Sequence, residues 1–249
     1  MAPTIHFIRH GEAAHNVNAD LNLHDPKMTP KGFKQCEQLT AEIAGLGHDF
    51  ELVFASPMKR TIQTALIAFP KYLQSKKIIL LSDLQEIGTY AADTGSSIKD
   101  LEDEFGTARL NYSLVQPCWT DKSPGTRYHI SNCVNRARVV RLFLKSVAQT
   151  YRDTDAHIAV VSHGNLLGYM SHPVADFKNC DRRTYRFEDG VDAELMAKLI
   201  ETPDSIARHE KKMKEAIPQG EFKNPFGVKI PLTFSGPATP SPSWLLNDK

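Results

Sequence analysis

The stretch Ile5-His6-Phe7-Ile8-Arg9-His10-Gly11-Glu12 passes from a short apolar run directly into a cation, an imidazole and a glycine. Its first four residues include branched and aromatic side chains, which predicts a buried strand. The run from His157 to Gly164 repeats this order, because apolar residues lead into a second His-Gly pair. Two further apolar runs, Leu52 to Ala55 and Ile78 to Leu81, predict strands of the same kind. Four buried strands are therefore expected, and two of them end on a histidine.

Segments with helical periodicity separate these strands. Thr29 followed by Pro30 is the expected start of one helix, whose apolar residues recur every three or four positions as far as Leu46. The other segments with helical character are 60–69, 140–151, 165–170, 192–200 and 204–216. Strands that alternate with helices and are apolar on both faces indicate an α/β protein with a largely parallel sheet.

Composition and charge exclude several classes of protein. The 249 residues include 30 Lys and Arg against 29 Asp and Glu, so no bulk positive charge indicates a nucleic acid or membrane partner. The longest apolar runs are too short to cross a bilayer, and no leader segment is expected after Met1. The four cysteines are scattered and form no CxxC pair, so neither a disulfide framework nor a zinc site is expected. These features predict a cytoplasmic protein.

The composition also suggests how the chain is divided. Residues 1–217 are expected to form one catalytic domain. Within it, residues 87–132 lack clear periodicity. They are interpreted either as a lid or specificity insertion, or as a partly helical segment. Residues 218–249 hold six of the fifteen prolines and are expected to form an extended tail. In that tail 228–234 is a candidate edge strand, and 237–242 is a proline-rich stretch for which disorder is the preferred interpretation.

The carboxyl ends of the four strands carry polar residues suited to phosphate chemistry. They present Arg9 and His10, then Arg60, then Glu86, and finally His163. Ligands of open α/β sheets bind beyond this edge. The planar guanidinium of arginine matches phosphate oxygens. These residue types in this order therefore predict a site for a small phosphorylated substrate.

In combination these motifs resemble the histidine phosphatase superfamily, the phosphoglycerate mutase-like enzymes. The matching residues cover about 4–170 and are Arg9-His10-Gly11-Glu12 with Asn16, Met28-Thr29-Pro30-Lys31-Gly32 with Gln35, Ser56-Pro57-Met58-Lys59-Arg60-Thr61-Ile62-Gln63-Thr64-Ala65, Glu86, and Val161-Ser162-His163-Gly164. Leu84-Gln85-Glu86 with Asp93-Thr94-Gly95-Ser96 further resembles fungal phosphatase members of the family. Met28 stands where the family usually has leucine, a tolerable apolar exchange.

The resemblance implies a three-layer α/β/α sandwich and a phosphohistidine intermediate. Because Arg9, Arg60 and His163 can neutralise the phosphate, no metal or other cofactor is expected. It makes His10 the nucleophile and Glu86 the candidate proton donor to the leaving oxygen. The phosphate-binding groups that it implies are Arg9, Gly11, Asn16, Arg60 and His163. Of these, Gly11 would supply the backbone carbonyl that sets the tautomer of the nucleophile.

Three functions remain open at this stage. The preferred one is a metal-independent phosphatase that hydrolyses a small phosphomonoester. A phosphomutase is the alternative, but it needs an extended basic clamp over its site, and the basic residues of 87–132 are interspersed with acidic ones. A non-catalytic phospho-ligand binder is the third, although every matched site residue is present. Substrate identity and oligomeric state stay open.

Several polar residues carry a functional and a structural interpretation. Glu12 is assigned equally to ordering the nucleophile loop and to catalysis. His6 is expected to pack within its strand. Four other histidines lack the spacing of metal ligands and are expected to be structural or solvated: His15, His24, His129 and His172. The pair Arg182-Arg183 is expected to be solvated.

Overall fold

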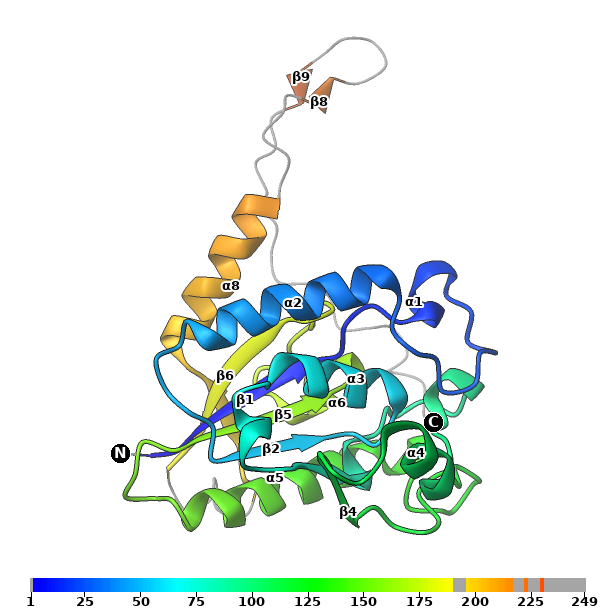
Figure 1. Ribbon diagram of the computed structural model, residues 1–249. Helices are drawn as coiled ribbons and strands as arrows, with labels where there is room; N and C mark the ends of the chain where they lie inside the picture. The colour runs from blue at the N-terminus through cyan, green and yellow to red at the C-terminus, as the bar shows by residue number, and fades with distance from the viewer. Residues whose placement is uncertain (1, 190–195, 217–221, 224–228, 231–249) are drawn as a thin grey trace, which may run out of the picture. The chain divides into compact units, whose positions relative to one another are not determined.

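A computed structural model describes residues 2–189, 196–216, 222–223 and 229–230. The contacts divide the chain into two units, residues 1–209 and 210–249. The first unit contains the seven-stranded sheet and the helices up to residue 209 (Figure 1), and the boundary falls within the helix Pro203–Ala216. Among the helices of the described residues, none combines the length and the apolar character that crossing a membrane requires.

A seven-stranded sheet forms the centre of the first unit, in the order β4-β3-β2-β5-β1-β6-β7. Its strands are β1 (Thr4–Arg9), β2 (Leu52–Ala55), β3 (Ile78–Leu81), β4 (Leu110–Leu114), β5 (His157–Ser162), β6 (Arg182–Phe187) and β7 (Leu199–Glu201). All neighbours from β4 to β1 run parallel, whereas β6 pairs antiparallel with both β1 and β7. The sheet is therefore mostly parallel, as expected.

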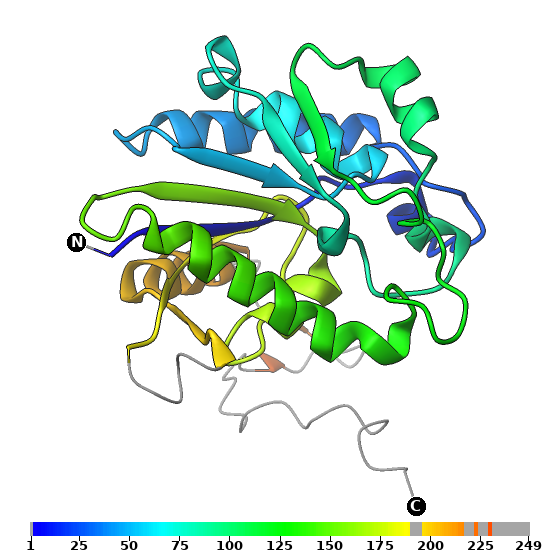
Figure 2. The same cartoon turned by 90° about the horizontal axis from the view of Figure 1, so that it is seen from below.

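Helices cover both faces of the sheet. The α-helices are α1 (Ala14–Asn18), α2 (Pro30–Ala44), α3 (Lys59–Ala68), α4 (Ile98–Phe105), α5 (Cys133–Gln149), α6 (Gly164–Met170) and α8 (Pro203–Ala216). Short 3₁₀ turns occur at Tyr72–Gln74, Ser82–Leu84, Ala91–Asp93 and Ile130–Asn132. The α2–α3 pair packs on one face and the α5–α6 pair on the other (Figures 1 and 2), which confirms the three-layer α/β/α sandwich.

The strands can support two layers because their side chains alternate between two apolar cores. On β1, Ile8 faces the core under α2 and α3, while Phe7 faces the core under α5 and α6. On β5, Val161 and Val160 divide in the same way. All four side chains are fully buried, which explains why the sequence shows continuous apolar runs rather than alternation.

Segment 87–132 contributes more to the sheet than its sequence suggested. It is partly helical, as one interpretation held, because it contains α4 and two short 3₁₀ turns. It also supplies β4, the edge strand next to β3, which the sequence did not predict. Its pattern Leu110 to Leu114 has only one apolar anchor, Leu110, that is fully buried. Edge strands carry weak apolar patterns because one side lacks a neighbouring strand.

The strands β6 and β7 correct two expectations. The pair Arg182-Arg183 lies on β6 and is buried, not solvated. Burial is possible because each guanidinium group donates hydrogen bonds to a carboxylate. Arg182 pairs with Glu42 of α2, and Arg183 pairs with Asp181. The helix expected over 192–200 is also wrong at its end, where Leu199–Glu201 is strand β7. Residues 190–195 lie outside the described part of the chain.

The second unit contains a short antiparallel pair, β8 (Phe222–Lys223) and β9 (Lys229–Ile230). The candidate strand 228–234 is thus described only at the two residues of β9. The proline-rich stretch 237–242 lies outside the described residues, as does most of the tail expected over 218–249.

Candidate active site

The carboxyl ends of the central strands meet at one edge of the sheet. Arg9 at the end of β1 is level with Ser162 at the end of β5. Ala55 at the end of β2 is level with Val161 on one side and with Leu80 on the other. Because these strands are parallel neighbours, the residues that follow each of them are brought to the same edge.

His10 is held in a single protonation state by its two neighbours. Arg60 Nε lies 3.3 Å from His10 Nε2, and a guanidinium nitrogen can only donate, so Nε2 is the acceptor. His10 Nδ1 lies 2.7 Å from the carbonyl oxygen of Gly11, which can only accept. The ring proton is therefore on Nδ1, and the lone pair of Nε2 faces the arginine. Gly11 takes the tautomer-setting role that the resemblance implied.

The surroundings of His10 keep its ring neutral. Its side chain is buried, and Arg60 next to it is fully buried as well. Burial, followed by the nearby charges of Arg60 and Arg9, holds the pKa of His10 well below its ordinary value. A neutral imidazole with a free lone pair is the form that can attack phosphorus.

Arg9, Arg60 and His163 surround His10 and are called the polar wall of the site. The His163 and His10 rings lie 5.2 Å apart, and His163 Nε2 is 2.9 Å from the Ser56 hydroxyl. Arg9 donates through Nη1 to the Phe177 carbonyl at 2.6 Å. Arg9 Nε and His163 Nδ1 are shielded from solvent and bond to no described residue. An arginine nitrogen can only donate, and a buried donor without a partner is costly, so Arg9 Nε points to a ligand that accepts hydrogen bonds. His163 Nδ1 donates as well in the tautomer in which Nε2 accepts from the Ser56 hydroxyl.

Glu12 has a structural position beside this wall. Its carboxylate accepts from the Thr29 hydroxyl at 2.9 Å and from Lys31 Nζ at 2.7 Å. These two hydrogen bonds lower the pKa of Glu12. A Cβ on Gly32 would come within 2.1 Å of the Glu12 carbonyl oxygen, so a glycine is needed there. Of the two interpretations of Glu12, these contacts favour ordering of the nucleophile loop.

Glu86 lies in a loop whose backbone is held by two buried cations. The Lys122 ammonium donates to the carbonyl oxygens of Glu86 and Gly88, both at 2.7 Å. Arg136 of α5 donates to the carbonyls of Gln85 at 2.6 Å and of Glu86 at 3.3 Å. The Glu86 carboxylate itself is buried and accepts only the Ile87 amide, at 2.8 Å, among described residues. The loop is thus fixed by its carbonyls, and the carboxyl group keeps an available oxygen.

Lys122 and Asp93 were not singled out as site residues from the sequence. Burial, followed by the nearby charge of Arg136, lowers the pKa of Lys122 to about 7. Burial and the neighbouring Glu86 raise the pKa of Asp93, whose Oδ1 lies 4.0 Å from Arg60 Nη2. Both come from segment 87–132, which has no periodicity to place them. Only the return of this segment to the sheet edge brings them to the site.

Asn16, which was expected to contact phosphate, is hydrogen-bonded to His15. The Asn16 side-chain oxygen accepts from the Ala13 amide at 3.0 Å, so its NH₂ group donates to His15 Nε2, also at 3.0 Å. His15 in its neutral form then carries its proton on Nδ1, which is buried and bonds to no described residue. Its ring lies 6.0 Å from that of His10, and burial lowers its pKa to about 4. His15 is therefore a candidate hydrogen-bond donor to a bound phosphate, a role that its sequence spacing did not indicate. Asn16 orients its ring.

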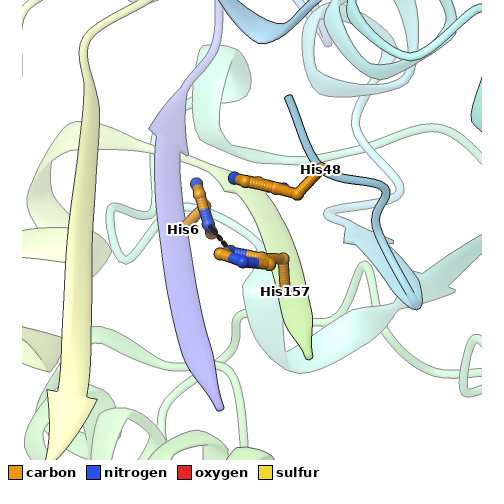
Figure 3. A group of neighbouring side chains, drawn as sticks. All are labelled: His6, His48 and His157. Carbon is orange, nitrogen blue, oxygen red and sulfur yellow. Dashed lines mark hydrogen bonds between the residues drawn. The ribbon is translucent and has the colours of Figure 1, made fainter. Parts of the chain in front are cut away.

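A second histidine cluster lies at the opposite ends of the strands. His6 of β1, His157 of β5 and His48 come together there (Figure 3), and one ring nitrogen from each lies within 4.8 Å of the others. His6 Nε2 is 2.9 Å from His157 Nδ1, and the His48 ring stacks on that of His157 at 3.3 Å. Among described residues this is the set whose spacing suits a metal ion.

Hydrogen bonds around His6 argue for a packed histidine chain rather than a metal centre. Arg182 Nη1 lies 3.2 Å from His6 Nδ1 and can only donate to it. Neutral His6 then has its proton on Nε2 and donates it to His157. A metal ion would need that nitrogen bare and would lie beside a guanidinium charge, both of which oppose binding. His6 is buried, which confirms that it packs within the strand.

The packed histidines His6, His48 and His157 predict that acid destabilises the fold. Burial, followed by His48, lowers the pKa of His157 to about 4, whereas an unfolded histidine titrates near 6.5. The contribution to stability is complete above pH 6.5 and is lost as the pH falls towards 4, because only the unfolded chain gains the proton. At about pH 5 we expect this histidine alone to cost about 2 kcal/mol.

Urea unfolding near pH 7 and near pH 5 measures this loss. His157→Gln should reduce the difference between the two pH values by about that amount. The matched control His172→Gln, at an exposed position, should leave it unchanged. An identical pH dependence in wild type and His157→Gln would contradict the assignment.

The fold and the polar edge of its sheet define the class, an α/β enzyme that acts on phosphorylated compounds. The chain belongs to the histidine phosphatase superfamily (branch 1), whose family model matches residues 5–188. It is thus a histidine phosphatase-type enzyme, with phosphatase or mutase activity.

Individual relatives agree with this assignment. The chain is 32% identical over 167 residues to a protein of Schizosaccharomyces pombe named as a probable phosphatase, covering 65% of this chain and 74% of that one. Two solved structures share the fold. One is the ecdysone phosphate phosphatase of the silkworm in complex with tungstate, with a TM-score of 0.54, 16% identity and coverage of 74% and 89%. The other is the phosphoglycerate mutase of Bacillus anthracis, with a TM-score of 0.52, 17% identity and coverage of 76% and 90%.

Proposed function

We propose that this protein is a cytoplasmic, metal-independent phosphatase that hydrolyses a small phosphomonoester through a phosphohistidine at His10. In the first step Nε2 attacks phosphorus while Glu86 gives its proton to the leaving oxygen. In the second step water attacks the phosphohistidine and Glu86 takes the proton back. Arg9, Arg60 and His163 bind the phosphoryl oxygens throughout, and His15, oriented by Asn16, extends this set.

One observation carries the proposal: Arg60 donates to His10 Nε2 at 3.3 Å. The same guanidinium that directs the lone pair of the nucleophile would contact the phosphoryl oxygens when substrate replaces that hydrogen bond. Phosphoryl transfer depends mainly on positioning and on neutralising the equatorial oxygens. Two arginines beside a neutral histidine supply both.

The partners of the basic residues in 87–132 favour hydrolysis over the mutase reaction. Lys99 pairs with Asp103, Arg127 binds Asp83 through two hydrogen bonds, and Lys122 bonds to backbone carbonyls. Three of the four basic residues of the segment are thus bonded to protein groups, and the fourth, Arg109, is a single exposed side chain, which disfavours an extended clamp for a bisphosphate. We further propose that 87–132 sets substrate preference, since Lys122 and Asp93 reach the site from it.

A panel of phosphorylated metabolites tests the activity. Release of inorganic phosphate from one or a few monoesters is the expected result, and phosphoryl transfer to a second substrate hydroxyl without net release would favour the mutase instead. Binding of phosphoesters with no turnover of any of them would favour the non-catalytic alternative.

Treatment with a chelator tests whether Arg9, Arg60 and His163 bind the phosphoryl group without a metal ion. We expect turnover to be unchanged after incubation with EDTA, because protein cations neutralise the phosphate. Vanadate should inhibit competitively, since its trigonal-bipyramidal form matches the charge distribution of the transition state. Loss of activity with EDTA that a divalent ion restores would refute metal independence.

A further inference from the structure

Two cysteine thiols lie against each other next to the nucleophile loop. Cys36 Sγ of α2 and Cys180 Sγ, in the turn before β6, are 3.6 Å apart. Cys36 is fully buried, whereas Cys180 is partly exposed. The residues are 144 positions apart in the chain, so no spacing rule for cysteines could pair them.

Both cysteines contact the backbone that carries His10, Cys180 through its amide and Cys36 through its sulfur. The Cys180 amide donates to the carbonyl oxygens of Arg9 at 3.1 Å and of His10 at 3.2 Å. The neighbouring Asn179 side chain donates to the same His10 carbonyl at 3.0 Å. On the other side, a Cβ on Gly11 would lie 3.0 Å from Cys36 Sγ, so that sulfur packs directly on the loop.

The pair has the features of reactive thiols. The hydrogen bond from Cys180 lowers the pKa of Cys36, which favours the thiolate. Cys180 lies in a turn with a φ of 55°, outside any helix or strand, and its partial exposure admits a small oxidant. Low thiolate pKa, access and an adjacent second thiol are the properties of redox-responsive cysteines.

We propose that Cys36 and Cys180 form an oxidative modification site, at which hydrogen peroxide produces a disulfide that reversibly inactivates the enzyme. The partly exposed Cys180 sulfur attacks the peroxide as its proton passes to the Cys36 thiolate. An S–O bond forms, the O–O bond breaks, and the hydroxide that leaves becomes water by taking up the proton that Cys36 had released. The Cys36 thiol then attacks the Cys180 sulfur, the S–O bond breaks, and the thiol proton leaves with the hydroxyl as water. Two thiols and one peroxide thus give one disulfide and two waters.

Disulfide formation must move the nucleophile loop. An S–S bond is about 2.05 Å long, so the sulfurs have to approach each other by about 1.5 Å. Cys36 is held within α2, so the turn at Cys180 makes most of this movement. Its amide carries the shift to the carbonyls of Arg9 and His10. Displacement of a reacting group by about 1 Å can cost on the order of 10²-fold in rate, which is the expected loss.

Peptide mapping and activity after peroxide treatment test the two parts separately. The protein should carry Cys118→Ser, because that exposed thiol would react on its own. We expect a cross-linked peptide joining Cys36 and Cys180, a mass lower by two hydrogen atoms, and activity that falls about 10²-fold and returns with dithiothreitol. Cys36→Ser and Cys180→Ser should each abolish the cross-link, while Cys133→Ser, a buried control on α5, should retain it.

The inactivation part rests on the proposed phosphatase activity, but the cross-link does not. Peroxide treatment that yields no Cys36–Cys180 peptide would overturn the site, whatever the activity does. A complete cross-link with unchanged turnover would overturn the regulation while leaving the phosphatase proposal intact. If the untreated protein turns over no phosphoester, the phosphatase proposal fails, and the cross-link and its reversal still decide whether the thiol site exists.

Discussion

Replacement of His10 by alanine should lower kcat for phosphomonoester hydrolysis on the order of 10⁶-fold, the loss seen when a catalytic nucleophile is removed. The reason is geometric as well as chemical. Arg60 and the Gly11 carbonyl fix the His10 ring so that the lone pair on Nε2 faces the phosphate-binding residues Arg9, Arg60 and His163. Without it, water would have to attack the monoester directly, with no covalent intermediate to divide the reaction into two steps.

Rapid quench with ³²P-labelled substrate gives the direct measurement. Wild type should form a phosphoenzyme that is labile in acid and stable in base, as a phosphoramidate is, and His10→Ala should form none. His172→Gln, an exposed histidine, is the matched control and should label normally. A His10→Ala enzyme that still turns over substrate at the wild-type rate would exclude the phosphohistidine mechanism.

Glu86→Gln should reduce hydrolysis of an alkyl phosphomonoester by about 10²–10⁴-fold. An alkoxide is a poor leaving group, so its departure requires a proton in the transition state. The amide of glutamine keeps the size of the side chain and loses the transferable proton. The same variant should lose much less activity with para-nitrophenyl phosphate, because that leaving group departs without protonation.

Asp93→Asn is the matched comparison, since Asp93 is a second buried carboxylate in the same stretch of the chain and lies next to Arg60. If Glu86 is the acid, only Glu86→Gln should show the dependence on the leaving group. Equal losses of Glu86→Gln on both substrates would exclude Glu86. Burial raises the pKa of Asp93, so that residue, rather than the loop-ordering Glu12, would then be the next candidate.

The strongest predictions from sequence concerned segments with both a clear period and a clear end. The buried strands at Leu52–Ala55 and Ile78–Leu81 were located to the residue, because apolar runs in a parallel sheet are continuous and flanked by polar residues. The same reasoning failed for β6. It begins with Arg182 and Arg183, whose burial depends on Glu42 and Asp181.

At the site, the sequence by itself determined the residues that follow directly from strand ends. Arg9, His10, Arg60 and His163 could be named because a parallel sheet necessarily brings its carboxyl ends to one edge. Only the tertiary structure decided which tautomer His10 adopts and that Glu12 orders a loop. Those properties depend on distances of a few ångströms between residues far apart in the chain.

The same division applies to the parts of the molecule that sequence reasoning passed over. Lys122 and Asp93 reach the site, and Cys36 meets Cys180, only because loops of irregular sequence return to the sheet edge. Periodicity reports which face of an element is buried, a local property that each segment carries in its own order of residues. Irregular segments show no such periodicity, so their sequence does not indicate which residues they will contact. Those contacts depend on how the complete sheet and both helical layers position the segments.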